Sequence, residues 1–260
     1  MKNIKYSLAP FSQAWDMLLD LSLPESLDSS NEQVESETML LNFPVVGAFI
    51  GICAYITAWI LNIVPGKPIA PYMAAIIIVM GLEFITSGRY LSSLISFIEN
   101  RVAGRPTHES LIQLNDEFNA PRSSTGTLLL VSLFLLRILC FSFLIQHGSM
   151  FWIIIVLTLN YSTQAYLASS VDIKSGDVFF DLSSRFERNL LIVTAGLTLI
   201  TGLVCFPVVA VALVAVGFGA YKFKQYCDRQ LGGMTAKMIG FGGYLAEGLV
   251  LLIGLTLLVN

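Results

Sequence analysis

Long apolar runs, separated by shorter polar segments, fill the chain from residue 41 onward. They are too continuous for a membrane β-barrel, whose strands alternate in polarity over about ten residues. They instead predict transmembrane helices, because about 20 apolar residues span the hydrocarbon core of a bilayer. We expect about seven spans, over residues 41–64, 69–98, 127–146, 151–169, 190–205, 208–221 and 238–259, with the second interrupted by the polar stretch 81–94. The predicted fold class is therefore an all-α, polytopic integral membrane helical bundle.

The fifth and sixth segments are broken at Phe206 and Pro207. Each is short for a bilayer of about 30 Å, so one long bent helix is an alternative to two spans. With seven spans and a cytoplasmic N-terminus, only Lys67 lies in an outside loop, as the positive-inside rule predicts. Merging the two segments would move four basic residues outside. The basic residues then placed inside are Lys2, Lys5, Arg101, Arg105, Arg122, Lys174, Arg185, Arg188, Lys222, Lys224, Arg229 and Lys237.

Residues 1–40 are polar and acidic, and we expect them to form a cytoplasmic N-terminal segment before a transmembrane domain over residues 41–260. The stretch "FSQAWDMLLDLSLP" predicts a short amphipathic helix with Phe11, Trp15 and Leu18 on one side. That helix could lie on the membrane surface or pack on the cytoplasmic end of the bundle.

Composition agrees with a protein of the cell (inner) membrane, with the lipid bilayer as its surroundings. Charged residues make up 13% of the chain and the mean hydropathy is +0.73, whereas soluble domains carry about 25% charged residues. The net charge of −3 gives no indication of nucleic acid as a partner. The four cysteines lack the spacing of a disulfide framework or a zinc site, so we expect small buried apolar side chains.

Four ionisable residues lie within or near the predicted spans: Glu83, Arg89, Arg137 and Glu247. A charge at membrane depth costs at least about 2.5–3.5 kcal/mol, so such residues usually pair inside a bundle. Glu83 and Arg89 are separated by about 600° of helix rotation and do not face each other. We therefore expect partners on other helices, with Arg137 and Glu247 as the candidates. The pairs are either part of a working site or structural ion pairs that fix helix packing.

Glycines cluster at the start of the first and last spans. Gly47 and Gly51 have the G-x-x-x-G spacing, and Gly232 and Gly233 open the segment "LGGMTAKMIGFGGYLAEG". Small residues let helices approach closely, and they also let a backbone approach a phosphate. Packing is the commoner reason for a single G-x-x-x-G match.

Four segments, in order, resemble the cobalamin synthase family, also called adenosylcobinamide-GDP ribazoletransferase. They are "MLLDLSLP", "FPVVGAFIG", "STGTLLLVSLFLLRIL" and "RQLGGMTAKMIGFGGYLAEGLVLL", and together they extend over nearly the whole chain. The resemblance implies a membrane enzyme of late cobalamin assembly that joins adenosylcobinamide-GDP to α-ribazole and releases GMP. It makes a corrinoid or a nucleotide the expected ligand. The candidate substrate-binding residues are Glu83, Arg89, Arg137, Gly232, Gly233, Thr235 and Glu247.

The chain departs from the family in its acidic motif, G-G-x-H-x-D-G-x-A-D-x-x-D-G. "GLEFITSGRYLSSL", residues 81–94, stands at that place, with Ser87, Leu91 and Leu94 at the three aspartates. Family members are expected to hold magnesium between such carboxylates and a diphosphate. Leucine cannot ligate a metal and serine is a weak ligand. The departure makes magnesium doubtful here, and we assign no metal-ligating residue.

Two later positions also depart from the pattern. Lys237 stands at an expected aspartate, and Tyr244 replaces the first of two late glutamates, while Glu247 keeps the second. The favoured interpretation is a divergent, catalytically degenerate paralogue that keeps a ligand cavity or partners an active synthase or a second copy of itself.

Two alternatives stay open. The first is an active ribazoletransferase whose ligands have moved to the loops, with Asp116, Glu117, Asp177 and Asp181 as candidates. The second is a small-molecule transporter or a membrane scaffold. A transporter would carry broken helices and paired charges near the middle of the bilayer. The charged residues here lie toward the cytoplasmic end of the bundle, which counts against a transporter.

Overall fold

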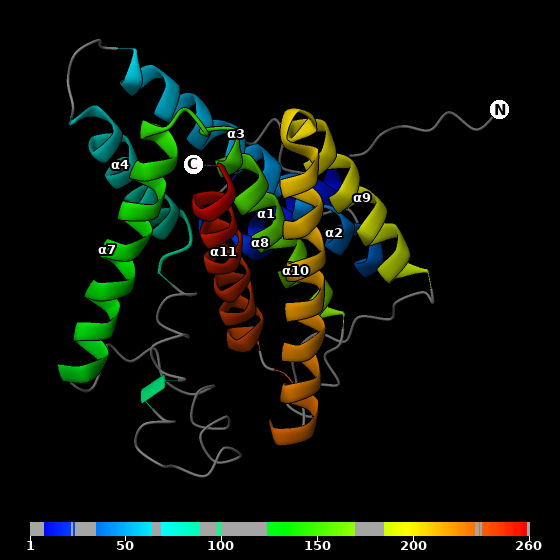
Figure 1. Cartoon of the computed structure of the whole chain (residues 1–260). Coiled ribbons are helices and arrows are strands. Elements are labelled where there is room, and N and C mark those ends of the chain that lie inside the picture. The colour runs from blue at the N-terminus through cyan, green and yellow to red at the C-terminus, as the bar shows by residue number, and fades with distance from the viewer. Residues whose placement is uncertain are drawn as a thin grey trace.

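The fold was analysed in a computed structural model, which describes residues 8–21, 23, 35–63, 69–88, 98–99, 124–169, 185–231, 234 and 236–258. Within these ranges the regular elements are helices (Figure 1). They are α1 (Ala9–Leu18), α2 (Ser36–Leu41), α3 (Phe43–Asn62), α4 (Ala70–Ile85), α7 (Ser124–Gln146), α8 (Trp152–Ala168), α9 (Phe186–Thr201), the 3-10 turn η1 (Leu203–Cys205), α10 (Phe206–Tyr226), the π-helical turn η2 (Cys227–Leu231) and α11 (Ala236–Leu258).

The helices α3, α4 and α7 to α11 fall on the predicted spans, with α4 covering the first half of the second one, so the helical membrane bundle is confirmed. Four stretches of the described chain are long and apolar enough to cross a bilayer, namely 36–62, 126–146, 206–229 and 238–258, and α4 is a shorter apolar helix. Figure 1 shows α7, α9 and α11 running upward and α8 and α10 running downward. Consecutive helices therefore alternate in direction, as a bundle crossing a membrane repeatedly requires.

The fifth and sixth spans are two separate helices, and the alternative of one bent helix is wrong. The helix α9 ends at Thr201, and Gly202 and η1 lead directly into α10. Pro207 lies in the first turn of α10, where its missing N–H leaves no hydrogen bond unmade. The chain reverses direction here, at the top of Figure 1.

The helix α4 ends at Ile85, inside the stretch where an interruption was expected, and no continuous helix reaches residue 98. Ser87 and Gly88 both have positive φ, 49° and 62°. The Gly88 N–H donates to the Glu83 carbonyl at 2.9 Å, and the Ser87 N–H donates to the Phe84 carbonyl at 3.2 Å. This pair of bonds is the Schellman arrangement that closes a helix C-terminus. It places Glu83 in the last turn of α4.

The helix α8 forms the centre of the bundle and packs against α3, α9, α10 and α11. All of its residues except Tyr166 are buried. The G-x-x-x-G glycines of α3 face it. A Cβ atom at Gly47 would lie 2.7 Å from the Leu157 carbonyl oxygen, and one at Gly51 would lie 2.7 Å from the Cα of Ile154. The interpretation of these glycines as packing residues is confirmed.

The amphipathic helix α1 packs on the bundle, against α3. Trp15 and Leu18 are buried, and the rings of Phe11 and Trp15 lie 6.2 and 5.8 Å from that of Phe49 on α3. Just beyond α1, the Asp20 N–H donates to the Ile85 carbonyl at 2.7 Å. The N-terminal segment thereby contacts the end of α4.

The cysteines are all free, but only two of them, Cys140 and Cys227, are buried. Cys53 is exposed on α3 and Cys205 is half-buried in η1. The expectation of buried side chains is wrong for Cys53, because its side of α3 faces away from the bundle.

Membrane topology gives the first prediction. Reporter fusions before Met1 and after Asn260 should place the N-terminus in the cytoplasm and the C-terminus outside, because the predicted number of spans, seven, is odd. A fusion after Gln146, between α7 and α8, should also report outside. Both termini on one side would contradict the seven-span arrangement.

The contact between α3 and α8 gives the second prediction. Gly51→Ala should lower the thermal stability of the protein in detergent, because its methyl group would meet backbone atoms of α8. Overpacking of this kind typically costs about 1–3 kcal/mol. Gly81→Ala on α4 is the matched control, since a Cβ there meets nothing within 4 Å. Equal melting temperatures for the two variants would contradict the close α3–α8 contact.

Candidate functional site

Arg137, in the middle of α7, is the centre of a buried ionic cluster. Its side chain donates from Nε to Glu247 Oε1 at 2.8 Å and from Nη1 to the carboxylate of Glu83. Nη1 also lies 2.7 Å from the Tyr244 hydroxyl, and the guanidinium carbon stands 4.7 Å from the centre of the Tyr244 ring. One guanidinium therefore joins α4, α7 and α11. The predicted pairing of Glu83 and Glu247 with an arginine on another helix is confirmed.

Glu247 is the most deeply buried member, with 1% of its surface exposed. Its second oxygen, Oε2, accepts a hydrogen bond from Asn160 Nδ2 on α8 at 2.8 Å. Gln164 in turn donates to Asn160 Oδ1 at 2.8 Å. Both oxygens of Glu247 are therefore satisfied, and the cluster extends to a fourth helix.

Gly243 permits this approach of α8 to α11. A Cβ atom at that position would lie 2.7 Å from Nε2 of Gln164 and would collide with the amide oxygen of Asn160. The glycine segment of the last span therefore provides room for polar side chains of α8. This is a packing role within the cluster.

Glu83 accepts bonds from both Arg137 and the Tyr244 hydroxyl on the same oxygen, Oε1. Its other oxygen, Oε2, is buried and has no hydrogen-bond partner in the described part of the chain. When both carboxylates are ionised, the cluster of Glu83, Glu247 and Arg137 carries one net negative charge. A buried acceptor without a partner is costly, so Oε2 is the position at which a ligand donor would be stabilised.

Sequence reasoning missed three members of the cluster: Tyr244, Asn160 and Gln164. Tyr244 was noted only as a replacement for a glutamate. The signal for the other two was present, since an amide pair four residues apart interrupts the apolar run of α8. Polar side chains within a span usually turn toward the bundle interior and bond across helices.

Of the seven predicted site residues, the structure brings together Glu83, Arg137 and Glu247. The other four, Arg89, Gly232, Gly233 and Thr235, lie outside the described residues. The loop acids considered as relocated ligands also lie outside them: Asp116, Glu117, Asp177 and Asp181.

Ser87, at one of the expected aspartate positions, contacts an acid from elsewhere in the chain. Its hydroxyl donates to the carboxylate of Asp20, which follows α1. The contact holds the end of α1 to the end of α4 and supports the left-handed backbone of Ser87. Its role is that of a junction between two helix ends.

The residues of this cluster do not fit a magnesium ion. Of the four oxygens of Glu83 and Glu247, three accept hydrogen bonds from Arg137, Tyr244 or Asn160. Magnesium prefers an octahedron of oxygen ligands, usually with carboxylates and several waters, and a guanidinium between the carboxylates opposes it. Over the described ranges, no three His, Cys, Asp or Glu side chains gather in a group that could hold a metal.

Comparison with known proteins identifies the family. A family model described as cobalamin-5-phosphate synthase matches residues 11–255. The chain belongs to this family. The resemblance drawn from the four segments is thereby confirmed, and membership links the protein to late cobalamin assembly.

Two relatives of this family member are similar along most of their length. An adenosylcobinamide-GDP ribazoletransferase of Vibrio parahaemolyticus serotype O3:K6 (strain RIMD 2210633) is 23% identical over 261 residues, which cover 96% of this chain and 93% of the relative. One of Clostridioides difficile (strain 630) is 27% identical over 238 residues, which cover 85% and 87%. No solved structure matches the chain.

The cluster of this cobalamin-synthase-family protein gives the third prediction. Glu247→Gln and Arg137→Gln should each lower stability. Arg137→Gln should cost about 3–5 kcal/mol, because it strands two buried carboxylates. Glu247→Gln should cost less, because Glu83 still pairs with Arg137. The double variant should lose less than the sum of the two single losses, since the residues share one interaction. Thermal unfolding in a single detergent measures all three.

Glu187→Gln is the matched control for that cycle. The Glu187 carboxylate lies 4.0 Å from Lys224 Nζ and its side chain is 64% exposed, so its loss should change stability by less than about 1 kcal/mol. Strict additivity of Glu247→Gln and Arg137→Gln would contradict the pairing.

Proposed function

We propose that this protein is a catalytically degenerate member of the cobalamin-5-phosphate synthase family. In this proposal it binds a corrinoid or a nucleotide of late cobalamin assembly in the cell (inner) membrane, with its N-terminus in the cytoplasm, and does not join the two. The observation that carries the proposal is that Glu83 and Glu247 both form ion pairs with Arg137.

The chemistry of the family reaction explains why these ion pairs matter. In the reaction that the family resemblance implies, a hydroxyl of α-ribazole attacks the corrinoid-bearing phosphorus of adenosylcobinamide-GDP. The new phosphoester bond forms as the bond to GMP breaks, and the hydroxyl loses its proton. A divalent cation normally neutralises the developing charge in such transfers. Here Glu83 and Glu247, the carboxylates that face the bundle interior, form ion pairs with Arg137. Ser87 and Tyr244 stand where the resembled pattern has acids.

The same residues support the proposal that the protein still binds a corrinoid or a nucleotide. Glu83 Oε2 is a free acceptor for a donor of a ligand, and Arg137 fixes the position of that carboxylate. Arg89, Gly232, Gly233 and Thr235 complete the proposed contacts with a phosphate. A second copy of this chain or an active synthase is the proposed protein partner.

The fourth prediction is an absence of turnover. Purified protein with adenosylcobinamide-GDP, α-ribazole and magnesium should release no GMP above a control without protein. The Vibrio parahaemolyticus relative, assayed in the same detergent, is the positive control. Adenosylcobinamide-GDP alone should still raise the melting temperature of this protein, and Arg137→Gln should reduce that rise.

Clear release of GMP would overturn the degenerate assignment. It would favour the second candidate, an active ribazoletransferase, which the names of both relatives support. Alanine variants of Asp116, Glu117, Asp177 and Asp181 would then locate its ligands. No turnover together with no stabilisation would instead favour a scaffold or a transporter.

A further inference from the structure

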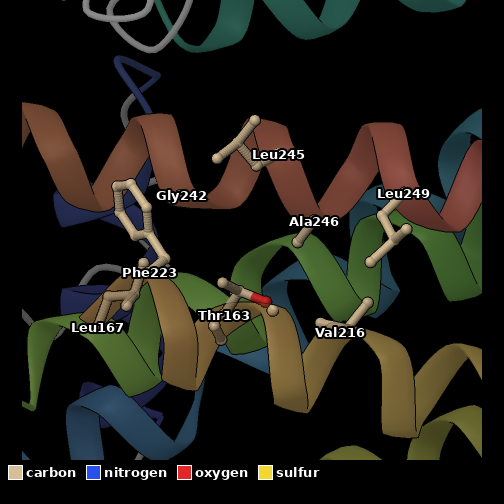
Figure 2. Close-up of a pocket in the computed structure, with 10 residues that line it drawn as sticks. Thr163, Leu167, Val216, Phe223, Gly242, Leu245, Ala246 and Leu249 are labelled. Carbon is tan, nitrogen blue, oxygen red and sulfur yellow. The ribbon is translucent and has the colours of Figure 1, made fainter. Parts of the chain in front are cut away.

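A groove between α8, α10 and α11 lies apart from the ionic cluster and is used by nothing described so far. It has a volume of about 100 Å³. Figure 2 shows side chains that line it. Val216, Gly219 and Phe223 line it from α10, and Gly242 and Leu249 line it from α11. By the helical rise of about 1.5 Å per residue, the lining from 216 to 223 extends over about 10 Å.

Two glycines shape the groove differently. At Gly242 a Cβ atom would collide with Leu167 and lie 3.2 Å from the ring of Phe223, so this glycine sets the closest approach of the helices. At Gly219 a Cβ atom would meet only Leu249 Cδ2, at 3.9 Å. Gly219 therefore leaves open space, which a larger side chain would fill without collision.

The groove is chemically apolar. Its polar side chain, Thr163, donates its hydroxyl to the Leu159 carbonyl of its own helix at 2.9 Å. The other lining residues are glycine or carry hydrocarbon side chains. A ligand that fits here is therefore a hydrocarbon.

The groove opens sideways, toward the bilayer. It lies within α10 and α11, both of which are long and apolar enough to cross a membrane. Leu245 on its rim is 48% exposed and Gly219 is also exposed. In a membrane, the medium in contact with this opening is lipid acyl chains.

Basic side chains lie next to one end of the groove. Lys222 and Lys224 flank Phe223 near the end of α10. The Lys222 ammonium lies 5.5 and 6.0 Å from the centres of the Phe218 and Tyr221 rings, beside the groove lining, and its residue is exposed. Lys224 Nζ lies 4.0 Å from the Glu187 carboxylate. Lysines near the end of a span extend toward the interface, where they attract anionic headgroups.

We propose that this groove binds one acyl chain of an anionic phospholipid, whose phosphate is bound by Lys222. The acyl chain lies between α10 and α11 along Gly219, and Lys224 lies beside Glu187. The lipid supports α11, the helix that carries Tyr244 and Glu247, from the side opposite the ionic cluster.

The test compares two leucine substitutions on one helix. Gly219→Leu fills the groove, whereas Gly217→Leu adds the same side chain where a Cβ meets nothing within 4 Å. Delipidated protein in detergent is mixed with dioleoylphosphatidylglycerol or dioleoylphosphatidylcholine. The melting temperature and the lipids retained in native mass spectrometry are then measured.

Phosphatidylglycerol should raise the melting temperature of the wild type and of Gly217→Leu by about 5 °C or more at saturation. Gly219→Leu should lose most of that rise and the retained lipid. Lys222→Gln should reduce the preference for phosphatidylglycerol over phosphatidylcholine. Glycerol phosphate, which has the charge without the chain, should give no rise.

Equal lipid responses of Gly219→Leu and Gly217→Leu would overturn the groove as the binding site. Equal responses to the two lipids in the wild type would overturn the anionic headgroup, and a response to glycerol phosphate would reassign the site to a free phosphate. Should Gly219→Leu fail to fold, Gly219→Ala is measured instead. It should retain less lipid than the wild type, and unchanged retention would count against the proposal.

Discussion

A guanidinium buried in an apolar bundle must be neutralised, and most of this structure is arranged around that requirement. Arg137 is charged at any accessible pH, so its charge cannot be avoided by losing a proton. Glu83 and Glu247 supply opposite charges from two other helices, and Tyr244 adds a hydroxyl and an aromatic face. Four helices meet at this point once Asn160 of α8 is included.

Several local features of the chain bring the four helices together at Arg137. The Schellman end of α4 places Glu83 in the last helical turn, beside α7. Gly243 lets α8 and α11 approach until Asn160 reaches Glu247. Gly51 fixes α8 against α3 on the other side. The position of each carboxylate thus depends on backbone geometry as much as on side-chain chemistry.

This arrangement bears directly on function. A carboxylate that neutralises an arginine is a poor ligand for a divalent cation, because the fixed charge opposes the ion. Removing the arginine would strand two negative charges, so catalytic and structural use of the same acids compete in this bundle. The family fold is kept while an arginine of the protein itself pairs with both interior carboxylates.

The sequence was sufficient for the large elements of the fold. Apolar runs predicted the spans, and Phe206-Pro207 predicted the break between α9 and α10, because proline at a helix start is a local signal. The pairing of Glu247 with an arginine followed from the cost of a bare charge in a membrane.

Other features depend on three-dimensional contacts that no local pattern records. The end of α4 at Ile85 rests on a serine with positive φ, which the contact of Ser87 with Asp20 supports from a distant part of the chain. The choice of Arg137 as partner depends on the rotation of α7 about its axis. The role of Tyr244 depends on its reach across to Glu83.

The central claim is that Glu83 and Glu247 pair with Arg137 rather than with a divalent cation. Its most direct test is a titration of the melting temperature with magnesium chloride, compared with sodium chloride at equal ionic strength. The account predicts that the two curves for the wild type coincide. A saturable rise with magnesium alone, abolished by Glu247→Gln, would contradict it.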